Sequence, residues 1–472
     1  MSKGITKKSD DHSKWYTDVI TKAELADYGP VKGTMVIKPY GFSIWELVKD
    51  EFDKQFKNTG HSNAYFPLFI PKSFLAKEAD HVEGFAKECA IVTHSRLMTD
   101  GDNIIQVDPS SKLEEEIIVR PTSETVIWHM YKKWINSYRD LPILINQWAN
   151  VVRWEMRTRL FLRTSEFLWQ EGHTAHANKE EAIDETLKIL DIYKNVSHKH
   201  LAMPVLTGRK TNAEKFAGAV DTYCIEAMMG DKRALQAGTS HYLGQNFAKA
   251  FDVKFQDVDN TEKYVYATSW GVSTRLIGAL IMVHGDDKGL RLPPNIAPIQ
   301  VVLVPIYKTE DDLEKIRRYL SNTIDYCTEH NITYYFDDRE KLSPGYKFNE
   351  WEMKGVPIRL EIGPRDMEKN EITIYRRDIK KKTILDISNS FDEINHLLSD
   401  IQNSMFKQAK NFLNNNTYEI SEWSLFKKQV KLGGFIKCGW DGSADTENLI
   451  KKETKATIRC ILSESPNSLN CI

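Results

Sequence analysis

The pattern of apolar and polar positions divides the chain into a long N-terminal part and two shorter parts that follow it. From Trp15 to about Pro298, apolar and aromatic residues are dense and no linker-like stretch interrupts them. We expect this part to form one large α/β unit. The proline-rich segment 293–298 then ends it, because proline terminates regular elements and stiffens connections.

After this segment the pattern changes to short apolar runs that alternate with helical spacing. The β-branched run 299–305 predicts a buried strand, the stretch 310–330 has the spacing of a helix, and residues 332–336 and 356–362 predict two further strands. Strands that alternate with helices are typical of a small parallel-sheet α/β domain. A charged helical connection and a tail containing glycine and cysteine follow. We therefore expect three domains, at residues 1–298, 299–400 and 401–472.

One early helix has a predicted start and a predicted end. Ser43 and Glu46 have the spacing of a capping box, in which each side chain satisfies a backbone amide at the helix start. Gly60 suits the C-terminal end. The sequence thus predicts a helix over Ser43–Thr59 and then a strand through 64–66 that ends at Pro67. The apolar stripe of this helix consists of Ile44, Leu47, Val48, Phe52 and Phe56.

Composition places the chain among ordinary water-soluble proteins. It has 472 residues, of which 41% are hydrophobic and 28% charged, and no apolar run is long enough to cross a bilayer. The first residues lack the apolar core of a secretory signal, so we expect a cytoplasmic protein with no membrane partner. The six cysteines are scattered, which favours reduced thiols over a disulfide framework.

The net charge neither requires nor excludes a nucleic-acid partner. A formal charge of −2 gives no global attraction to phosphates, but a local patch can still bind them. The most basic run is 376–382, RRDIKKK. On its own it is best interpreted as a solvated surface turn.

The chain contains no GxxxxGK[ST] loop, strand-coupled GxGxxG, HExxH or GxSxG. Instead, the run VVRWE at 151–155 and the run 161–167 predict a strand, a basic turn and a returning strand. Arg153 and Glu155 are two apart and should share one face of the first strand. A guanidinium suits phosphate oxygens, and a neighbouring carboxylate can accept from an exocyclic amine. The competing interpretation is a surface ion pair.

A second segment, SWGVSTR at 269–275, precedes an apolar helical run at 276–281. Small residues followed by Arg275 would allow close backbone approach and place a cation at a helix start. The competing interpretation is a helix cap with a solvated arginine.

Together these segments resemble the three signatures of class II aminoacyl-tRNA synthetases. Pro67 would close the first, Arg153 and Glu155 lie in the second, and Arg275 ends the third. Longer strings, among them RPTSETVIW, NQWANVVRWE, FLWQEGHTAH and ALQAGTSHYLGQNFAKAF, resemble prolyl-tRNA synthetases of the archaeal/eukaryotic-like type over nearly the whole chain. The resemblance implies an α/β (α+β) fold. It would have a class II antiparallel-sheet catalytic domain, an α/β anticodon-binding domain and a small C-terminal domain.

The resemblance also implies an activity and its residues. The enzyme would activate L-proline with ATP to prolyl-adenylate and transfer it to tRNA(Pro), with ATP as substrate and Mg²⁺ as cofactor. Arg153 and Arg275 would be catalytic in the sense of stabilising the transition state. The proline-binding residues would be Thr122, Glu124, Arg153, Trp169, Glu171, His173, His241, Ser269, Trp270 and Gly271. The ATP-binding residues would be Arg153, Glu155, Arg163, Thr164, Phe167, Gln236, Thr239 and Arg275. The anticodon would contact Arg339, Lys347, Glu352 and Lys354.

Two further expectations concern assembly and metal. The resemblance implies a homodimer, with the helix Ser43–Thr59 near the interface. Many relatives bind a structural zinc ion through four C-terminal cysteines. Here Cys438 and Cys471 match two of those positions, while Thr446 replaces the second ligand and the chain stops before the fourth. A structural zinc site normally has four N or S ligands. No zinc is therefore expected, and the tail should be held by packing of residues such as Phe435, Trp440 and Ile458.

Two other functions fit the same overall pattern. One is another class IIa synthetase, such as a threonyl or seryl enzyme, but a tryptophan wall at Trp169 suits a nonpolar ring. The other is a non-catalytic paralogue that binds RNA or a protein partner. Such paralogues commonly lose the signature arginines, and Arg153 and Arg275 are both present.

Overall fold

The computed structural model describes residues 4–74, 88–100 and 103–462. Its largest element is an eight-stranded sheet, antiparallel except where the edge strand β3 pairs with β9. In spatial order the strands are β24 (Ile461–Leu462), β11 (Val205–Arg209), β12 (Asp221–Met228), β13 (Ala234–Gly244), β16 (Tyr266–Ser273), β10 (Glu166–His176), β9 (Ile143–Val152) and β3 (Ser62–Asn63). This confirms the antiparallel sheet that was expected of the first domain.

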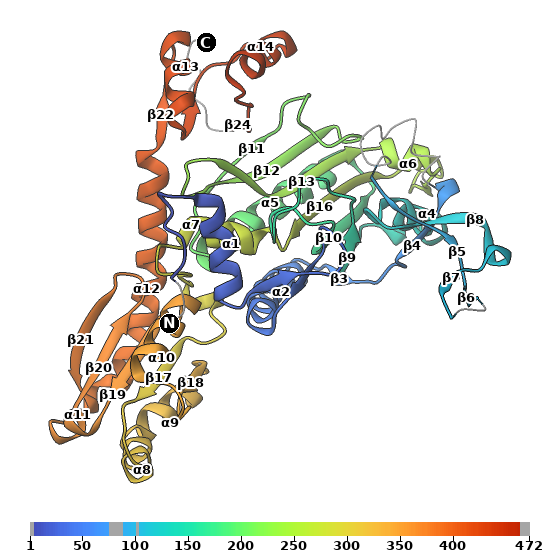
Figure 1. Ribbon diagram of the computed structural model, residues 1–472. Helices are drawn as coiled ribbons and strands as arrows, with labels where there is room; N and C mark the ends of the chain where they lie inside the picture. The colour runs from blue at the N-terminus through green and yellow to red at the C-terminus, as the bar shows by residue number, and fades with distance from the viewer. Residues whose placement is uncertain (1–3, 75–87, 101–102, 463–472) are drawn as a thin grey trace.

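Helices cover one face of this sheet and leave the other for a cavity. Tyr193 of α5 donates to Gln170 of β10 at 2.8 Å, and Ser240 of β13 donates to the backbone of Thr186 in α5 at 2.8 Å. The covering helices are α1 (His12–Lys22), α2 (Pro39–Asn58), α5 (Lys179–Lys199) and α7 (Arg275–His284), and their apolar faces form the main core (Figure 1). Because strand side chains alternate, residues at odd positions of β10 point away from these helices.

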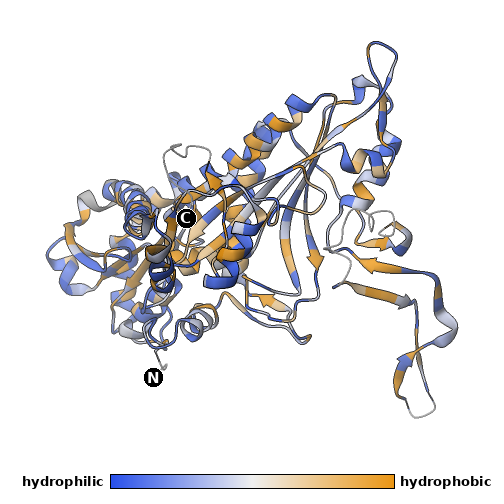
Figure 2. Ribbon diagram, turned by 90° about the horizontal axis from the view of Figure 1, so that it is seen from above, coloured by the Kyte–Doolittle hydropathy of each residue, from blue (hydrophilic) through white to orange (hydrophobic). Residues whose placement is uncertain are grey.

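Smaller elements surround the sheet. The helices α4 (Glu124–Trp134) and α6 (Asn246–Ala250) pack in a second apolar cluster. A ribbon projects from the body of the molecule (Figures 1 and 2). It contains β4 (Phe69–Pro71), β5 (Ala90–His94), β8 (Lys112–Val119) and the hairpin of β6 (Leu97–Thr99) and β7 (Ile105–Val107). The remaining short pairs are β1 (Ala26–Tyr28) with β2 (Met35–Ile37), and β14 (Lys254–Gln256) with β15 (Glu262–Tyr264).

The second unit has a five-stranded mixed sheet. Its order is β18 (Tyr334–Phe336), β17 (Val301–Pro305), β19 (Ile358–Ile362), β20 (Glu371–Arg376) and β21 (Lys381–Asp386). The first three strands are parallel as predicted, but β20 and β21 add antiparallel edges, so the expectation of a purely parallel sheet was wrong. The helices of this unit are α8 (Glu310–Tyr319), α9 (Ser321–Glu329), α10 (Pro344–Lys354) and α11 (Pro364–Glu368). The single helix predicted over 310–330 is therefore two helices, which meet at Leu320.

The long helix α12 (Ile387–Asn415) runs from the second unit along the first towards the C-terminal elements (Figure 1). The boundary expected between residues 400 and 401 falls inside this helix, so the chain has no break there. Beyond it lie β22 (Thr417–Glu419), α13 (Trp423–Leu432), β23 (Phe435–Lys437) and α14 (Ala444–Thr454). The chain then returns to the first unit, where β24 pairs with β11.

Two local predictions were wrong because they used only nearby residues. The helix α2 starts at Pro39 rather than Ser43, and its N-cap, Lys38, makes no side-chain capping bond, so the capping box at Ser43 does not form. An amide N–H at the first helical position has no partner within the helix, so the N–H that proline lacks is not missed there. This explains why the helix can start at Pro39. The strand expected over 64–66 is only Ser62–Asn63, although Ala64 still donates to Asn146 at 2.9 Å.

The basic run 376–382 forms a turn, but it is not simply solvated. Arg377 is 1% exposed and donates two hydrogen bonds to Asp286 of the first unit, at 2.8 and 2.7 Å. Burial alone would raise the pKa of Asp286, but Arg377 holds that pKa well below its usual range. This pair fastens the second unit to the loop that follows α7.

Among the described residues, no helix is both long and apolar enough to cross a membrane.

Candidate active site

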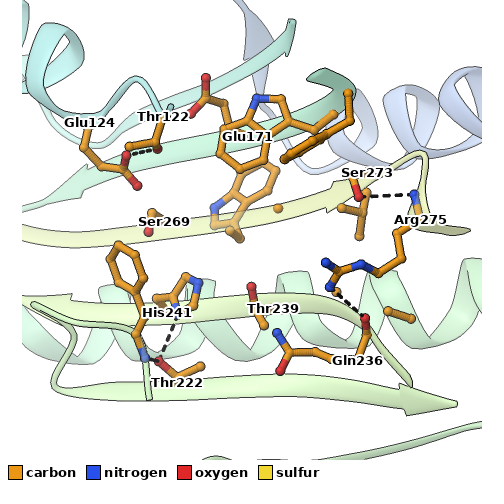
Figure 3. Close-up of a pocket in the computed structure, with 18 of the residues that line it drawn as sticks. Thr122, Glu124, Glu171, Thr222, Gln236, Thr239, His241, Ser269, Ser273 and Arg275 are labelled. Atoms are coloured by element: carbon orange, nitrogen blue, oxygen red, sulfur yellow. Dashed lines mark hydrogen bonds between the residues drawn. The ribbon is translucent and has the colours of Figure 1, made fainter. Parts of the chain in front are cut away.

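A cavity of about 270 Å³ lies on the sheet face opposite α5 (Figure 3). Strands β10, β13 and β16 form its floor, and the turn before α4 and the segment around Phe216 border it. The lining residues are Thr122, Glu124, Arg153, Phe167, Trp169, Glu171, His173, Glu214, Phe216, Thr222, Gln236, Ala237, Gly238, Thr239, His241, Ser269, Trp270, Gly271, Val272, Ser273 and Arg275.

Glu171 is the buried charge at the centre of the floor. It is 2% exposed and accepts hydrogen bonds from Ser123 Oγ at 2.5 Å, Ser123 N at 3.2 Å and Gln147 Nε2 at 2.7 Å. His173 Nε2 lies 3.1 Å from Glu171 Oε2, the oxygen that also accepts from the Ser123 amide. Burial alone would raise the pKa of Glu171, but these partners, His173 first among them, lower it and keep the carboxylate ionised.

The acidic end of the cavity suits a small cation. Glu124, Glu171 and His173 each offer an atom within 4.8 Å of the others, and all three are buried. Burial alone would lower the pKa of His173, but its bond to Glu171 and the charge of Glu124 raise it. His173 Nδ1 and Ser269 Oγ are buried and have no hydrogen-bond partner among the described residues. Orphaned polar atoms of this kind require a ligand or water.

A neutral histidine forms the adjoining wall. His241 Nδ1 lies 2.9 Å from Thr222 Oγ1, and the Phe216 ring packs on it with a centroid separation of 4.7 Å. Burial, reinforced by the charge of His173, lowers the pKa of His241 to about 3. The imidazole is therefore uncharged at neutral pH.

Two arginines also line the cavity. Arg153 Nε donates to the carbonyl of Pro121 at 2.9 Å, and its guanidinium lies 5.6 Å from the Phe167 ring centroid and 5.2 Å from that of Trp169. Arg275 Nε donates to the carbonyl of Leu162 at 3.3 Å. Burial lowers the pKa of both arginines, but a guanidinium stays protonated in proteins. Two half-buried guanidiniums in one cavity suit a phosphate chain.

The structure brings together most residues predicted for the two substrates, but not all. Glu155, Arg163 and Thr164 do not line the cavity. Glu155 instead lies 2.9 Å from Arg163, and Thr164 donates to the backbone of Glu166 at 2.7 Å. The prediction that Arg153 and Glu155 share a strand face was wrong, because β9 ends at Val152.

Trp270 borders the cavity only with its backbone side. In the register of β10 and β16 it pairs with Gly172, on the face that the helices cover. Its ring packs on Phe56 at 4.9 Å and on His61 at 5.2 Å between centroids. The tryptophan wall of the cavity is therefore Trp169.

Seven lining residues escaped the sequence analysis. Four of them, Ala237, Gly238, Val272 and Ser273, lie beside predicted residues on β13 and β16. Of the other three, Glu214 and Phe216 lie in the connection between β11 and β12, and Thr222 is the second residue of β12. No periodicity marks them, because this connection reaches the cavity only through the tertiary fold.

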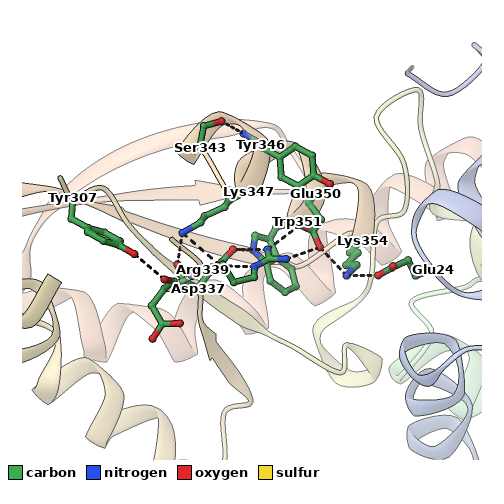
Figure 4. Close-up of polar contacts among 11 residues, drawn as sticks. Glu24, Tyr307, Asp337, Arg339, Ser343, Tyr346, Lys347, Glu350, Trp351 and Lys354 are labelled. Atoms are coloured by element: carbon green, nitrogen blue, oxygen red, sulfur yellow. Dashed lines mark hydrogen bonds and ion pairs between the residues drawn. The ribbon is translucent and has the colours of Figure 1, made fainter. Parts of the chain in front are cut away.

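The four residues predicted to contact an anticodon lie in the second unit, and three of them, Arg339, Lys347 and Lys354, belong to a network within the protein (Figure 4). Lys347 is 2% exposed and donates to the carbonyl of Asp337 at 2.9 Å. Arg339 forms ion pairs with Asp337 at 2.8 Å and with Glu350 at 2.9 Å. Lys354 bonds Glu24 of the first unit at 2.7 Å. The fourth, Glu352, accepts from Tyr375 at 2.7 Å.

A second cavity, of about 260 Å³, lies where α8 and α10 begin. Arg339 and Lys347 line it, together with Tyr307 and Glu340. The role of the four predicted residues in RNA binding stays a prediction.

The amino-acid sequence matches three family models in succession. Residues 106–284 match "tRNA synthetase class II core domain (G, H, P, S and T)", residues 300–397 match "Anticodon binding domain", and residues 423–472 match "Prolyl-tRNA synthetase, C-terminal". The sheet and its cavity are therefore the core of a class II aminoacyl-tRNA synthetase.

Similar proteins cover nearly the whole chain. A proline–tRNA ligase of Azobacteroides pseudotrichonymphae is 59% identical over 97% of this chain and 93% of its own length. A proline–tRNA ligase of Cytophaga hutchinsonii is 58% identical over 98% of this chain and 94% of its own length. One of Flavobacterium psychrophilum is 56% identical over 100% of this chain and 97% of its own length. The chain belongs to the prolyl-tRNA synthetase family, which confirms the resemblance inferred from the sequence.

Proposed function

We propose that the protein activates L-proline with ATP in the cytoplasm, releasing pyrophosphate, and then transfers the prolyl group to the 3′ end of tRNA(Pro). One observation carries this proposal within the family: a single cavity is lined by a carboxylate–histidine cluster and by two arginines. The first suits a secondary ammonium, and the second suits a carboxylate and phosphates.

At the acidic end, the imino group of proline would meet Glu124 and Thr122. Glu171 and His173 would contribute from the floor. Trp169 would cover the pyrrolidine ring. His241, Ser269 and Gly271 would border the remaining sides. The orphaned Ser269 Oγ supports a polar ligand at this position.

At the basic end, Arg153 would bind the proline carboxylate and the α-phosphate together, and Arg275 the γ-phosphate. Phe167, Thr239 and Gln236 also line the cavity. The oxygens of Gln236 and Thr239 suit the Mg²⁺ that accompanies ATP, since Mg²⁺ prefers oxygen ligands. Glu155, Arg163 and Thr164 could read adenine only after a rearrangement of the 155–165 turn, in which the Glu155–Arg163 pair would open.

The chemistry needs no protein nucleophile. The proline carboxylate attacks the α-phosphorus in line, a P–O bond forms, and pyrophosphate leaves. The tRNA hydroxyl then attacks the mixed anhydride and releases AMP. Positioning and stabilisation of the developing charge by Arg153 and Arg275 supply most of the rate.

For tRNA recognition, we propose that the anticodon binds at the second cavity, with Arg339 and Lys347. Single-stranded bases are read by stacking and by hydrogen bonds to their edges, and Tyr307, Arg339 and Glu340 offer both. Lys347 would have to leave the Asp337 carbonyl to contact RNA.

The alternative is a non-catalytic paralogue. It is disfavoured because both signature arginines lie at the same cavity as the acidic cluster.

The first prediction tests proline activation. Wild-type protein should catalyse proline-dependent ATP–pyrophosphate exchange without tRNA. Arg153→Ala should lower kcat/KM by about 10²-fold or more, because it removes a charged donor to the reacting phosphate. Arg318→Ala is the matched control, since its side chain is 81% exposed in α8. No exchange by folded wild type, or an Arg153→Ala rate within a few-fold of it, would contradict the assignment.

The second prediction separates the two faces of the sheet. A Cβ on Gly271 would lie 3.1 Å from the Gln170 carbonyl and 3.7 Å from the Trp169 ring, so Gly271→Ala should raise the KM for proline about 10-fold with little change in Tm. A Cβ on Gly172 would lie 2.1 Å from the Trp270 ring, on the covered face. Gly172→Ala should therefore lower Tm. Equal effects of both variants on Tm and KM would show that the two glycines do not divide these roles.

We also propose a homodimer whose interface includes α2 and the segment after it. The edge strand β3 ends the large sheet, and apolar side chains near it are exposed: Tyr65 by 73% and Phe69 by 49%. A second copy related by two-fold symmetry would cover them. Light scattering at micromolar concentration should give twice the chain mass, whereas a monomer mass would refute the dimer.

We further propose that the C-terminal unit folds without zinc. Thr446, at the position of the second ligand, donates its hydroxyl to Asp441 at 2.7 Å, and its amide donates to Ser443 Oγ, the N-cap of α14, at 3.1 Å. Phe435, Trp440 and Ile458 are each half-buried, and Cys471 lies outside the described residues. Elemental analysis after dialysis against a mild chelator should find no zinc. One equivalent per chain would overturn the proposal.

A further inference from the structure

The chain returns from the C-terminal unit to lie on the outer strands of the large sheet (Figure 1). We call residues 456–462 the C-terminal strap. Its last two residues form β24, which pairs with β11 at Gly208 and Arg209. Arg459 reaches across to Glu226 of β12, with three nitrogen–oxygen distances of 3.0 to 3.2 Å.

The strap places two cysteines against each other over Gly208. In the sheet, Gly208 is the direct partner of Cys224. Cys224 Sγ lies 3.7 Å from the Gly208 carbonyl and 3.9 Å from that of Arg459. A Cβ on Gly208 would lie 2.9 Å from Cys460 Sγ, so the missing side chain leaves the room that this thiol occupies. Direct partners in a sheet project their side chains to the same face, so the thiols of Cys224 and Cys460 lie on the same side of Gly208, next to each other.

The two thiols differ in reactivity, because the contact between them shifts their pKa values in opposite directions. Lys210 Nζ lies 2.8 Å from Glu226 and donates to the Arg459 carbonyl at 2.7 Å, so two cations and one carboxylate adjoin the sulfurs. The contact with Cys224 lowers the pKa of Cys460, and the same contact, with burial, raises the pKa of Cys224. The thiolate is the form that attacks an oxidant. Cys460 is also half-buried, whereas Cys224 is fully buried.

We propose that Cys224 and Cys460 form a reversible disulfide that locks the C-terminal strap onto the catalytic sheet under oxidising conditions. The oxidant is hydrogen peroxide. The Cys460 thiolate attacks the peroxide O–O bond, becomes a sulfenic acid, and releases water once the leaving oxygen is protonated. Cys224 then attacks the Cys460 sulfur, and a second water leaves. Two thiols are oxidised, one peroxide is reduced, and an external dithiol reverses the reaction.

The lock acts on strands that carry the active site. β12 supplies Thr222 to the cavity, and its neighbour β13 supplies Gln236, Thr239 and His241. While the thiols are reduced, the strap is held by the Arg459–Glu226 pair and the short β24 ladder. The disulfide adds a covalent bond and slows its detachment.

Mass spectrometry tests the bond directly in the full-length wild type. Reduced protein treated with hydrogen peroxide should lose two hydrogen atoms, and a non-reducing tryptic map should contain a peptide that joins Cys224 to Cys460. Dithiothreitol should separate it. Amide exchange of residues 457–462 should slow about 10-fold or more on oxidation, since a cross-link suppresses local opening.

Three variants make the outcome specific. Cys438→Ser should keep the cross-link, as a matched loss of a cysteine elsewhere in the C-terminal unit. Cys460→Ala, with an unchanged circular dichroism spectrum, should lose both the cross-link and the oxidant-dependent slowing. Gly208→Ala should suppress the cross-link by displacing the Cys460 sulfur. A folded, peroxide-treated wild type in which Cys224 and Cys460 stay alkylatable, carry separate oxygen adducts or pair with other cysteines would overturn the proposal.

Discussion

The arrangement of the active site depends on one buried carboxylate, Glu171, in the middle of an antiparallel sheet. An ionised group in that position is tolerated only when hydrogen bonds replace its lost water. Ser123 and Gln147 supply those bonds, and His173 supplies a further contact. Gln147 also accepts from the amide of Phe66, so the same network fixes the segment after α2. The hydrogen bonds to the Glu171 carboxylate thus fix three parts of the chain relative to the floor of the cavity: the turn before α4, strand β9 and the segment after α2.

The same requirement recurs at three other carboxylates of the first unit, Asp286, Glu226 and Glu185. Asp286 receives Arg377 and so holds the second unit against the end of α7. Glu226 receives Arg459 and Lys210 and so holds the C-terminal strap. Glu185 of α5 lies 3.0 Å from His61, which follows α2. Removing one partner of such a pair leaves a buried charge unpaired and lowers the free energy of unfolding by about 3–5 kcal/mol. Each pair therefore holds one particular segment in place.

Local sequence patterns predicted the elements that their own residues determine. The apolar run after Arg275 correctly gave α7, and Trp169, Glu171 and His173, which the resemblance assigned to one pocket, share one face of β10 because they alternate along it. What failed depends on contacts between distant residues. Glu155 left the strand because β9 ends where Arg153 turns to the Pro121 carbonyl. Trp270 faces the helices because its register with Gly172 is set across two strands. Neither the mixed sheet of the second unit nor the return of β24 leaves a periodic signal in the sequence.

The distribution of charge in the cavity also explains how an amino acid would be oriented in the proposed reaction. Glu124 and Glu171 attract the ammonium end of a zwitterion, while Arg153 lies between these carboxylates and the Arg275 end and attracts its carboxylate. Reversing the zwitterion would place an ammonium against a guanidinium and a carboxylate against Glu171, and both contacts are repulsive at short range in a site of low dielectric constant. The neutral state of His241 matters here, because a third cation on that wall would weaken the preference. The charges that hold the ammonium group of proline near Glu124 and Glu171 therefore also orient its carboxylate oxygen towards the phosphate bound by the arginines.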